Sequence, residues 1–167
     1  IIIGEKVTEL MPAMFQNCES LTQFTIPKNI TKMGASVFSN CTSLEEAILN
    51  CNIDNPQNSY FWNCLNLKTV KFNGEFPYLP NMMFEDCTSL SSVLFYSNNI
   101  YIGVNAFKNC TALKSISLSS TKVIYESAFE GCTSLESVYT NNLIQINKSA
   151  FMGCDVLASI ITTKYVL

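Results

Sequence analysis

Two residue types that often build functional sites are missing from this 167-residue sequence. There is no histidine, which removes the usual proton shuttle at neutral pH and the base that activates most serine and cysteine nucleophiles. Arginine is missing as well, so all ten basic residues are lysines, and the net charge is −3. No basic face is therefore available to neutralise a phosphate backbone. We expect no enzymatic activity, no cofactor and no nucleic-acid partner.

Charge and long apolar runs are also scarce. Only 14% of the residues are charged, while 48% are hydrophobic, which is enough apolar material for a folded core. No stretch approaches the roughly 18 continuous apolar residues of a spanning helix, so we expect no membrane insertion by this segment. The opening IIIGEKVTEL does not read as a signal peptide. Both ends fall within a repeat unit and lack a polar capping unit, which predicts a segment of a longer array.

One short pattern occurs seven times. It begins with a phenylalanine and continues with a cysteine and a leucine in constant register, with the phenylalanines 23 or 22 residues apart at Phe15, Phe38, Phe61, Phe84, Phe107, Phe129 and Phe151. A period of about 20 to 29 residues with an L-x-x-L-x-L core is typical of leucine-rich repeats. The sequence therefore predicts a single leucine-rich repeat domain over residues 1–167, built from about seven units of 22–23 residues.

Each unit ends in alternating apolar and polar residues, which predicts a short strand with one buried face. The strands are expected near residues 23–26, 46–49, 69–72, 92–95, 115–118, 137–139 and 159–162. Before each strand, residues such as Phe107, Cys110 and Leu113 have the spacing of one helical face. Serine or asparagine precedes this segment as a possible N-cap, at Ser36, Ser59, Asn105, Ser127 and Ser149.

The predicted fold class is an α/β repeat. It is a right-handed leucine-rich repeat solenoid with one parallel sheet of short strands and short helical turns on the opposite face. The right hand follows from the rule for parallel crossovers. A departure is expected at residues 50–60, where NCNIDNPQNSY has polar residues and Pro56 in place of the usual apolar pair. The return segment should bulge there.

The unit F-x-x-C-x-x-L-x-x-[VI]-x-[LIF], preceded by I-G-x-x-A-F at residues 102–107, resembles the BspA-like class of leucine-rich repeats. Proteins of that class are mostly surface or secreted products of mucosal bacteria and of some parasitic protists. Several are adhesins for host matrix proteins or for other cells. The resemblance therefore implies a cell-surface or secreted location and a binding function, without implying a particular ligand.

Eight cysteines raise the question of metal or disulfide sites. None forms the C-x2-C pair of a zinc site, and we expect no metal. Seven occur once per unit, at Cys18, Cys41, Cys64, Cys87, Cys110, Cys132 and Cys154. Stacking at about 4.8 Å would allow some disulfides by distance, but equivalent side chains point the same way, which favours buried free thiols acting as small hydrophobes. Cys51 lies outside this register and is either a reactive thiol or a half-buried loop residue.

Other candidates have competing interpretations. Trp62 follows Phe61 at a position that is polar in most units, so it is either an exposed binding residue or a ring covered by the 50–60 bulge. Glu45 and Glu46 are neighbours in a strand and point to opposite faces, which favours a solvated surface over an acid–base pair.

The outward positions of the predicted strands form a nearly uncharged surface of Ser, Thr and Asn with a few larger side chains. The predicted ligand-binding residues on it are Ile48, Lys71, Leu94, Tyr96, Tyr139 and Ile161. Aromatic and aliphatic anchors among small hydroxyls suit a protein partner, although Ser, Thr and β-branched residues are also ordinary strand formers. We predict a surface module that binds an extracellular matrix or cell-surface protein. The alternative is an intracellular scaffold for protein–protein interaction.

Overall fold

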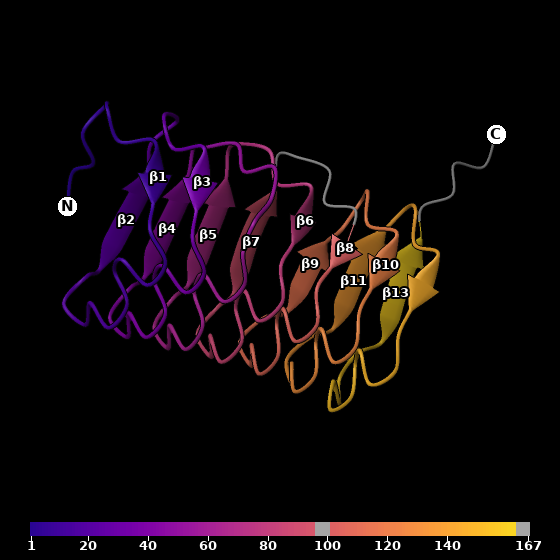
Figure 1. Cartoon of the computed structure of the whole chain (residues 1–167). Coiled ribbons are helices and arrows are strands. Elements are labelled where there is room, and N and C mark those ends of the chain that lie inside the picture. Colours follow the sequence, from indigo (N-terminus) through magenta and orange to yellow (C-terminus); the bar gives the residue numbers. More distant parts are fainter. Residues whose placement is uncertain (96–100, 163–167) are drawn as a thin grey trace.

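The computed structural model describes residues 1–95 and 101–162 of the chain. The chain winds into stacked coils, and each coil contributes one strand to a row that runs from the N-terminal to the C-terminal end (Figure 1). We call the outer side of this row the strand face. Its strands are β2 (Gln23–Ile26), β4 (Glu46–Leu49), β5 (Thr69–Phe72), β7 (Ser92–Phe95), β9 (Ser115–Ser117), β11 (Ser137–Thr140) and β13 (Ser159–Thr162). The predicted strand bounds are confirmed to within one residue.

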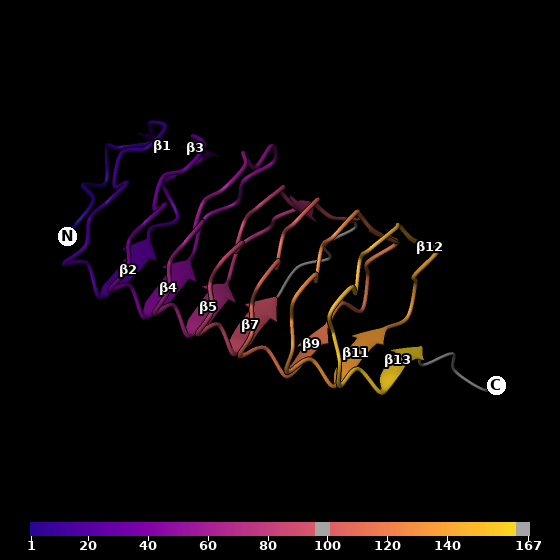
Figure 2. The same cartoon turned by 90° about the horizontal axis from the view of Figure 1, so that it is seen from below.

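A second row of shorter strands lies on the opposite edge of the coils, where the chain returns (Figure 2). We call the outer side of this row the return face. Its strands are β1 (Glu9–Leu10), β3 (Lys32–Met33), β6 (Tyr78–Leu79), β8 (Tyr101–Ile102), β10 (Val123–Ile124) and β12 (Gln145–Ile146). In β6, β8 and β10 the second residue is buried and the first points outward. The coils thus enclose a core between two strand layers.

All strand pairs are parallel, as predicted, and equivalent residues of successive coils lie opposite one another. The prediction of one sheet is wrong, because the strand face divides into the sheets β2-β4-β5-β7 and β9-β11-β13. Val93 and Phe95 of β7 are only half-buried, whereas Val70 and Phe72 of β5 are fully buried. The packing is therefore looser where β7 and β9 meet. The hand of the coil stays a prediction.

The core is one continuous cluster that runs through the stack from Leu10 to Ala150. Its centre is a column formed by the repeated phenylalanines. Neighbouring rings of this column have centroids 5.0 to 5.7 Å apart and lie within 29° of parallel. This distance is within the favourable range for offset aromatic pairs. Each inner phenylalanine therefore packs on its copies in the coils before and after it.

The predicted helical turns are wrong, since the described residues contain no helix. The five residues proposed as N-caps have φ angles of 54° to 62°, whereas an N-cap residue has an extended backbone. Alternate N–H groups in this segment donate to the neighbouring coil, as Phe38 does to the carbonyl of Tyr60 at 2.9 Å and Asn40 to that of Trp62 at 2.8 Å. A helix would need these groups for bonds within its own turn. Backbone hydrogen bonds between coils therefore take the place of the bonds that a helix would form within its own turns.

The position two residues after each phenylalanine also has a left-handed backbone. It holds Asn17, Asn40, Asn63, Asp86, Asn109, Gly131 and Gly153, all with positive φ. Asn63 Nδ2 donates to Asn40 Oδ1 at 2.8 Å, and Asn40 Nδ2 donates to Asn17 Oδ1 at 3.0 Å. We call this row the asparagine ladder. It explains the residue choice, because Asn, Asp and Gly tolerate left-handed φ better than other residues.

Residues 50–60 interrupt the return face, which confirms the predicted departure from the repeat. We call this segment the 50–60 bulge. The short strands divide here into the sheets β1-β3 and β6-β8-β10-β12. Cys51 and Ile53 are fully buried and supply apolar contacts in place of the usual apolar pair. The buried Tyr60 hydroxyl accepts the N–H of Gln57 at 2.9 Å and donates to the carbonyl of Met33 at 3.2 Å. Tyr60 therefore ties the bulge to β3 where a strand pair is missing.

Candidate functional site

Side chains on the strand face alternate as predicted. In β2, Gln23 and Thr25 are exposed while Phe24 and Ile26 are buried. The strands β4 and β5 show the same alternation with half-buried outward residues. The outward residues therefore form a surface that any partner on this side would contact.

The structure brings the predicted binding residues together in two groups. Ile48, Lys71 and Leu94 lie opposite one another on β4, β5 and β7. Tyr139 and Ile161 lie opposite one another on β11 and β13. Leu94 and Tyr139 are 44% and 45% exposed, the largest exposures among these five residues. The sixth predicted residue, Tyr96, lies outside the described residues.

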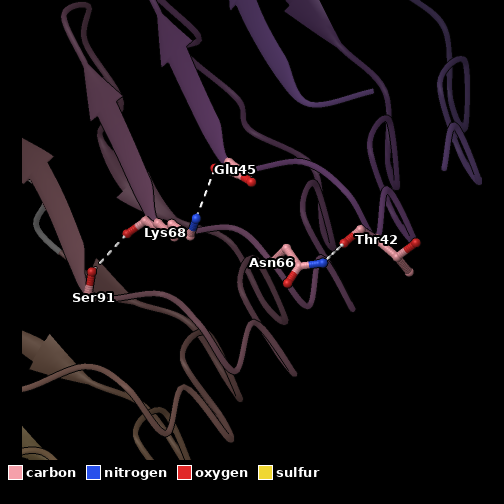
Figure 3. A network of polar contacts seen from close by, with 5 residues as sticks. All are labelled: Thr42, Glu45, Asn66, Lys68 and Ser91. Carbon is pink, nitrogen blue, oxygen red and sulfur yellow. Dashed lines mark hydrogen bonds and ion pairs between the residues drawn. The ribbon is translucent and has the colours of Figure 1, made fainter. Parts of the chain in front are cut away.

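The charges on this surface are paired. Lys71 Nζ lies 2.7 Å from Glu46 Oε1, on the strand face. At the N-terminal ends of the strands, Lys68 Nζ lies 2.9 Å from Glu45 Oε2 (Figure 3). Figure 3 also shows Asn66 donating to the Thr42 carbonyl and Ser91 donating to the Lys68 carbonyl. Each carboxylate of the Glu45–Glu46 doublet therefore has its own lysine from the next coil, as expected of a solvated surface.

The second acidic doublet is Glu85–Asp86, directly after the repeated Phe84. It lies in the turns between the return face and the strand face, which we call the turn side of the coils. Partial burial and the neighbouring Asp86 charge raise the pKa of the Glu85 carboxyl above its ordinary value. Glu85 accepts a bond from Asn105 Nδ2 at 3.4 Å, and Asp86 accepts one from Asn109 Nδ2 at 2.8 Å. Both carboxylates are therefore engaged with asparagines of the next coil.

The repeated cysteines form a second ladder inside the stack, and all eight cysteines are free thiols. From Cys41 onward each repeated thiol donates to the backbone carbonyl of the phenylalanine one coil earlier, over distances of 3.0 to 3.2 Å. Burial raises the pKa of the Cys64, Cys87 and Cys110 thiols well above the ordinary range. A protonated thiol is a poor nucleophile and metal ligand. The ladder is therefore a structural element, with hydrogen bonds that the sequence did not reveal.

Cys51 is neither a reactive thiol nor half-buried, because its side chain is fully buried. Burial raises its pKa to about 12. The bulge turns this residue into the core, where it contributes apolar contact. Cys18 and Cys154, at the two ends of the cysteine ladder, are the partly exposed thiols.

Trp62 lies on the turn side of its coil and is 36% exposed. The 50–60 segment therefore leaves part of its surface accessible. Ser39, the equivalent residue one coil earlier, is fully buried and donates to the Ser59 carbonyl at 2.7 Å. Trp62 is thus on a different side from the strand face.

Within residues 1–95 and 101–162, no three His, Cys, Asp or Glu side chains are grouped in a way that would hold a metal ion. The same part of the chain has no helix long and apolar enough to span a bilayer.

The sequence did not reveal a groove of about 590 Å³ on the return face, beside the 50–60 bulge. Its lining includes the tyrosines Tyr78, Tyr101 and Tyr125 and side-chain amides of the bulge and the following coil. One signal was present, because Tyr78 and Tyr101 are a full 23-residue period apart. The sequence alone did not show that the bulge would fold beside them.

Comparison with known proteins identifies the repeat. The BspA type leucine-rich repeat region matches residues 1–91 and 57–166, with six copies. No curated protein matches the chain.

Several solved structures share the fold. A leucine-rich repeat protein from Bacteroides ovatus is 32% identical with a TM-score of 0.80, over 93% of this chain and 40% of that one. A second, from Eubacterium ventriosum, is 27% identical with a TM-score of 0.69, over 100% and 38% of the two chains. A leucine-rich cell surface protein from Faecalibacterium prausnitzii is 22% identical with a TM-score of 0.60, over 98% and 53%, and shows the fold alone.

The chain thus spans about half or less of the length of these three proteins. The family match extends over nearly all of its residues, and strands of successive coils pair in parallel. The chain belongs to the BspA-type leucine-rich repeat family.

Proposed function

We propose that this chain is a non-enzymatic protein-binding module of a cell-surface or secreted protein, and that it attaches to host or matrix proteins through the strand face. The observation that carries the proposal is the exposure of Leu94 and Tyr139, one on each sheet of the strand face, among small hydroxyl side chains. Tyrosine offers apolar area and a hydroxyl at low entropic cost, and apolar anchors among small polar groups are typical of protein-binding surfaces.

The charge distribution supports a protein partner that binds mainly by shape and apolar contact. Lys71 is the charged member of the predicted site, and Glu46 pairs with it. A partner that covers this surface therefore removes few unpaired charges from water, which keeps the desolvation cost low. Binding should depend only weakly on salt.

The location rests on the relatives. The similar protein from Faecalibacterium prausnitzii is described as a cell surface protein. Surface proteins of this repeat class include adhesins. Within the described strands of the strand face Lys71 is the one basic residue, which fits a protein ligand better than a nucleic acid.

A binding panel of immobilised extracellular matrix and cell-surface proteins tests the proposal. The parent should bind at least one panel member, and the double variant Leu94→Ala/Tyr139→Ala should lose about 2 kcal/mol of binding free energy, roughly thirty-fold in Kd. The matched control is Tyr101→Ala/Tyr125→Ala, which removes two similarly exposed tyrosines from the return face. If the parent binds and the strand-face variant binds equally well, the strand face is not the site. Trp62 and the 50–60 bulge would then be the better candidates.

A further inference from the structure

The return-face groove has an aromatic wall. Tyr78 on β6 and Tyr101 on β8 lie opposite one another in the strand register. Tyr125 follows β10, and its ring centroid is 6.2 Å from that of Tyr101 with the planes tilted by 46°. Tyr101 and Tyr125 are 40% and 38% exposed. Two rings therefore present apolar surface and a hydroxyl each to the groove.

Part of the groove's lining is bare backbone at Gly103. A Cβ at this position would lie 2.8 Å from both the Leu79 carbonyl oxygen and the Asn81 nitrogen. No side chain fits there without moving the neighbouring coil. The groove is therefore open at Gly103. The equivalent position in the next coil holds Tyr125.

Three side-chain amides of the lining are held in place by bonds within the fold. Asn55 Oδ1 accepts the Tyr78 hydroxyl at 2.7 Å, and Asn81 Oδ1 accepts the Val104 N–H at 2.9 Å. Gln57 Nε2 donates to the Asn55 carbonyl at 3.1 Å. These bonds use the oxygens of Asn55 and Asn81 and the nitrogen of Gln57. These bonds fix how the three amides are oriented. The NH2 group of each asparagine and the Oε1 of the glutamine take no part in them, so these groups can bond a ligand.

We infer that this groove binds a neutral oligosaccharide. Each sugar hydroxyl both donates and accepts, so a sugar chain can satisfy the two amide NH2 groups and the glutamine oxygen together. The C–H faces of sugar rings pack on aromatic faces, whose π electrons are negative, and Tyr101 and Tyr125 supply such faces. A volume of about 590 Å³ is within the range of small-ligand sites.

Two other ligand classes fit less well. A proline-rich peptide in an aromatic groove offers mainly carbonyl acceptors, which would bond the asparagine NH2 groups but would make little use of the exposed Gln57 oxygen. An anionic glycan would need cations, and no lysine is among the described residues that line the groove. The uncharged lining therefore favours a neutral, hydroxyl-rich ligand. Because the groove is on the return face, this binding is separate from protein binding at the strand face.

An array of neutral oligosaccharides, including glucans, mannans, galactans and xylans, tests the inference, with sulfated glycans and a proline-rich peptide as comparison probes. The parent should retain at least one neutral glycan. Tyr101→Ala and Tyr125→Ala should each weaken that binding about ten-fold. Gln57→Leu should weaken it as well, since it removes the acceptor while keeping the backbone N–H that bonds Tyr60.

The matched control is Tyr139→Ala, which removes a tyrosine of similar exposure from the strand face and should leave glycan binding unchanged. Thermal unfolding of each variant establishes that it is folded. The inference is overturned if the parent binds no neutral glycan or if the three groove variants bind as the parent does. Preferred binding of the sulfated glycans or of the peptide overturns it too. The double variant Leu94→Ala/Tyr139→Ala tests protein binding at the strand face alone. The protein-binding proposal and the glycan-binding proposal can therefore be overturned independently of each other.

Discussion

The carbonyl oxygen of Phe38 accepts two hydrogen bonds, one from the Cys41 N–H at 3.2 Å and one from the Cys64 thiol at 3.1 Å. The same arrangement recurs along the cysteine ladder. A carbonyl has two lone pairs, and a buried one is costly to leave partly unpaired. Cysteine is small enough for the core and still donates a weak bond, which alanine or valine cannot do.

The buried thiols predict a loss of stability in alkali. Burial raises the pKa of Cys41 from 9.0 to about 11 and that of Cys51 to about 12. Below pH 9 these thiols are protonated in both states, so the folded state keeps its full stability. Above pH 9 the unfolded chain releases protons that the folded chain retains, and stability falls by about 1.4 kcal/mol per pH unit for each such thiol. Urea unfolding at about pH 8 and about pH 10 should show a much lower midpoint at the higher pH.

The control for this prediction removes the titrating groups. Cys41→Ala/Cys51→Ala should be less stable near neutral pH, because it loses core contact and the bond to the Phe15 carbonyl. Its stability should nevertheless fall less steeply with pH than that of the parent. Equal midpoints for the parent at the two pH values would show that the thiols ionise as easily in the fold as in the unfolded chain.

At the scale of the element, the strands were predictable and the turns were not. Alternation such as Phe24 and Ile26 buried between Gln23 and Thr25 has only one good structural explanation, a half-buried strand. The spacing of Phe107, Cys110 and Leu113 fits a helix, but it equally fits consecutive turns that point these side chains inward. The asparagine ladder held the missing signal, because a position restricted to Asn, Asp and Gly indicates positive φ.

Substitutions at Asn63 distinguish a turn from a helix. Asn63 has a φ of 57°, which costs alanine about 1 to 2 kcal/mol but not glycine. Asn63→Ala should therefore destabilise the protein more than Asn63→Gly does, although both lose the bond to Asn40 Oδ1. In a helix the order would be reversed, because glycine is worse than alanine there. Urea midpoints of the two variants measure the difference.

Asn66 supplies the comparison position. Its Nδ2 donates to the Thr42 carbonyl at 2.8 Å, and it is not one of the positive-φ residues. Asn66→Gly should therefore be at least as destabilising as Asn66→Ala. Finding the same order at both positions would mean that the backbone angle at Asn63 is not the cause.

At the scale of the whole molecule, the residues of the strand face were predictable from the sequence, whereas the groove on the return face was not. Period and alternation place Leu94 and Tyr139 on the strand face, since every coil obeys the same rule. The return-face groove depends on the irregular residues 50–60, whose amides Asn55 and Gln57 approach the tyrosines only after the bulge has folded. Repetition makes the regular part predictable, while an irregular segment has no copies from which its position can be inferred.

The backbone bonds between coils predict how the molecule responds to a pulling force. Phe38 donates to Tyr60 of the next coil, and Phe61 donates to Met83 in the same way. Force applied to the two ends peels off a terminal coil first, and the bonds of the inner coils carry load only after it has left. Each released coil of 23 residues adds about 80 Å of extended chain. Single-molecule pulling should give a series of steps near this length, whereas one step for the whole chain would show that the coils break together.

If the coils come off one at a time, such a solenoid should act as an extensible tether. A compact globular domain loses its fold in one event when overloaded, but a stack of similar coils yields in small increments and lengthens each time. The inner coils keep their side-chain surfaces while the outer ones unwind, because each coil contacts mainly its neighbours. Under the proposed adhesive function, a sudden pull would be absorbed as chain extension before the attachment itself is broken.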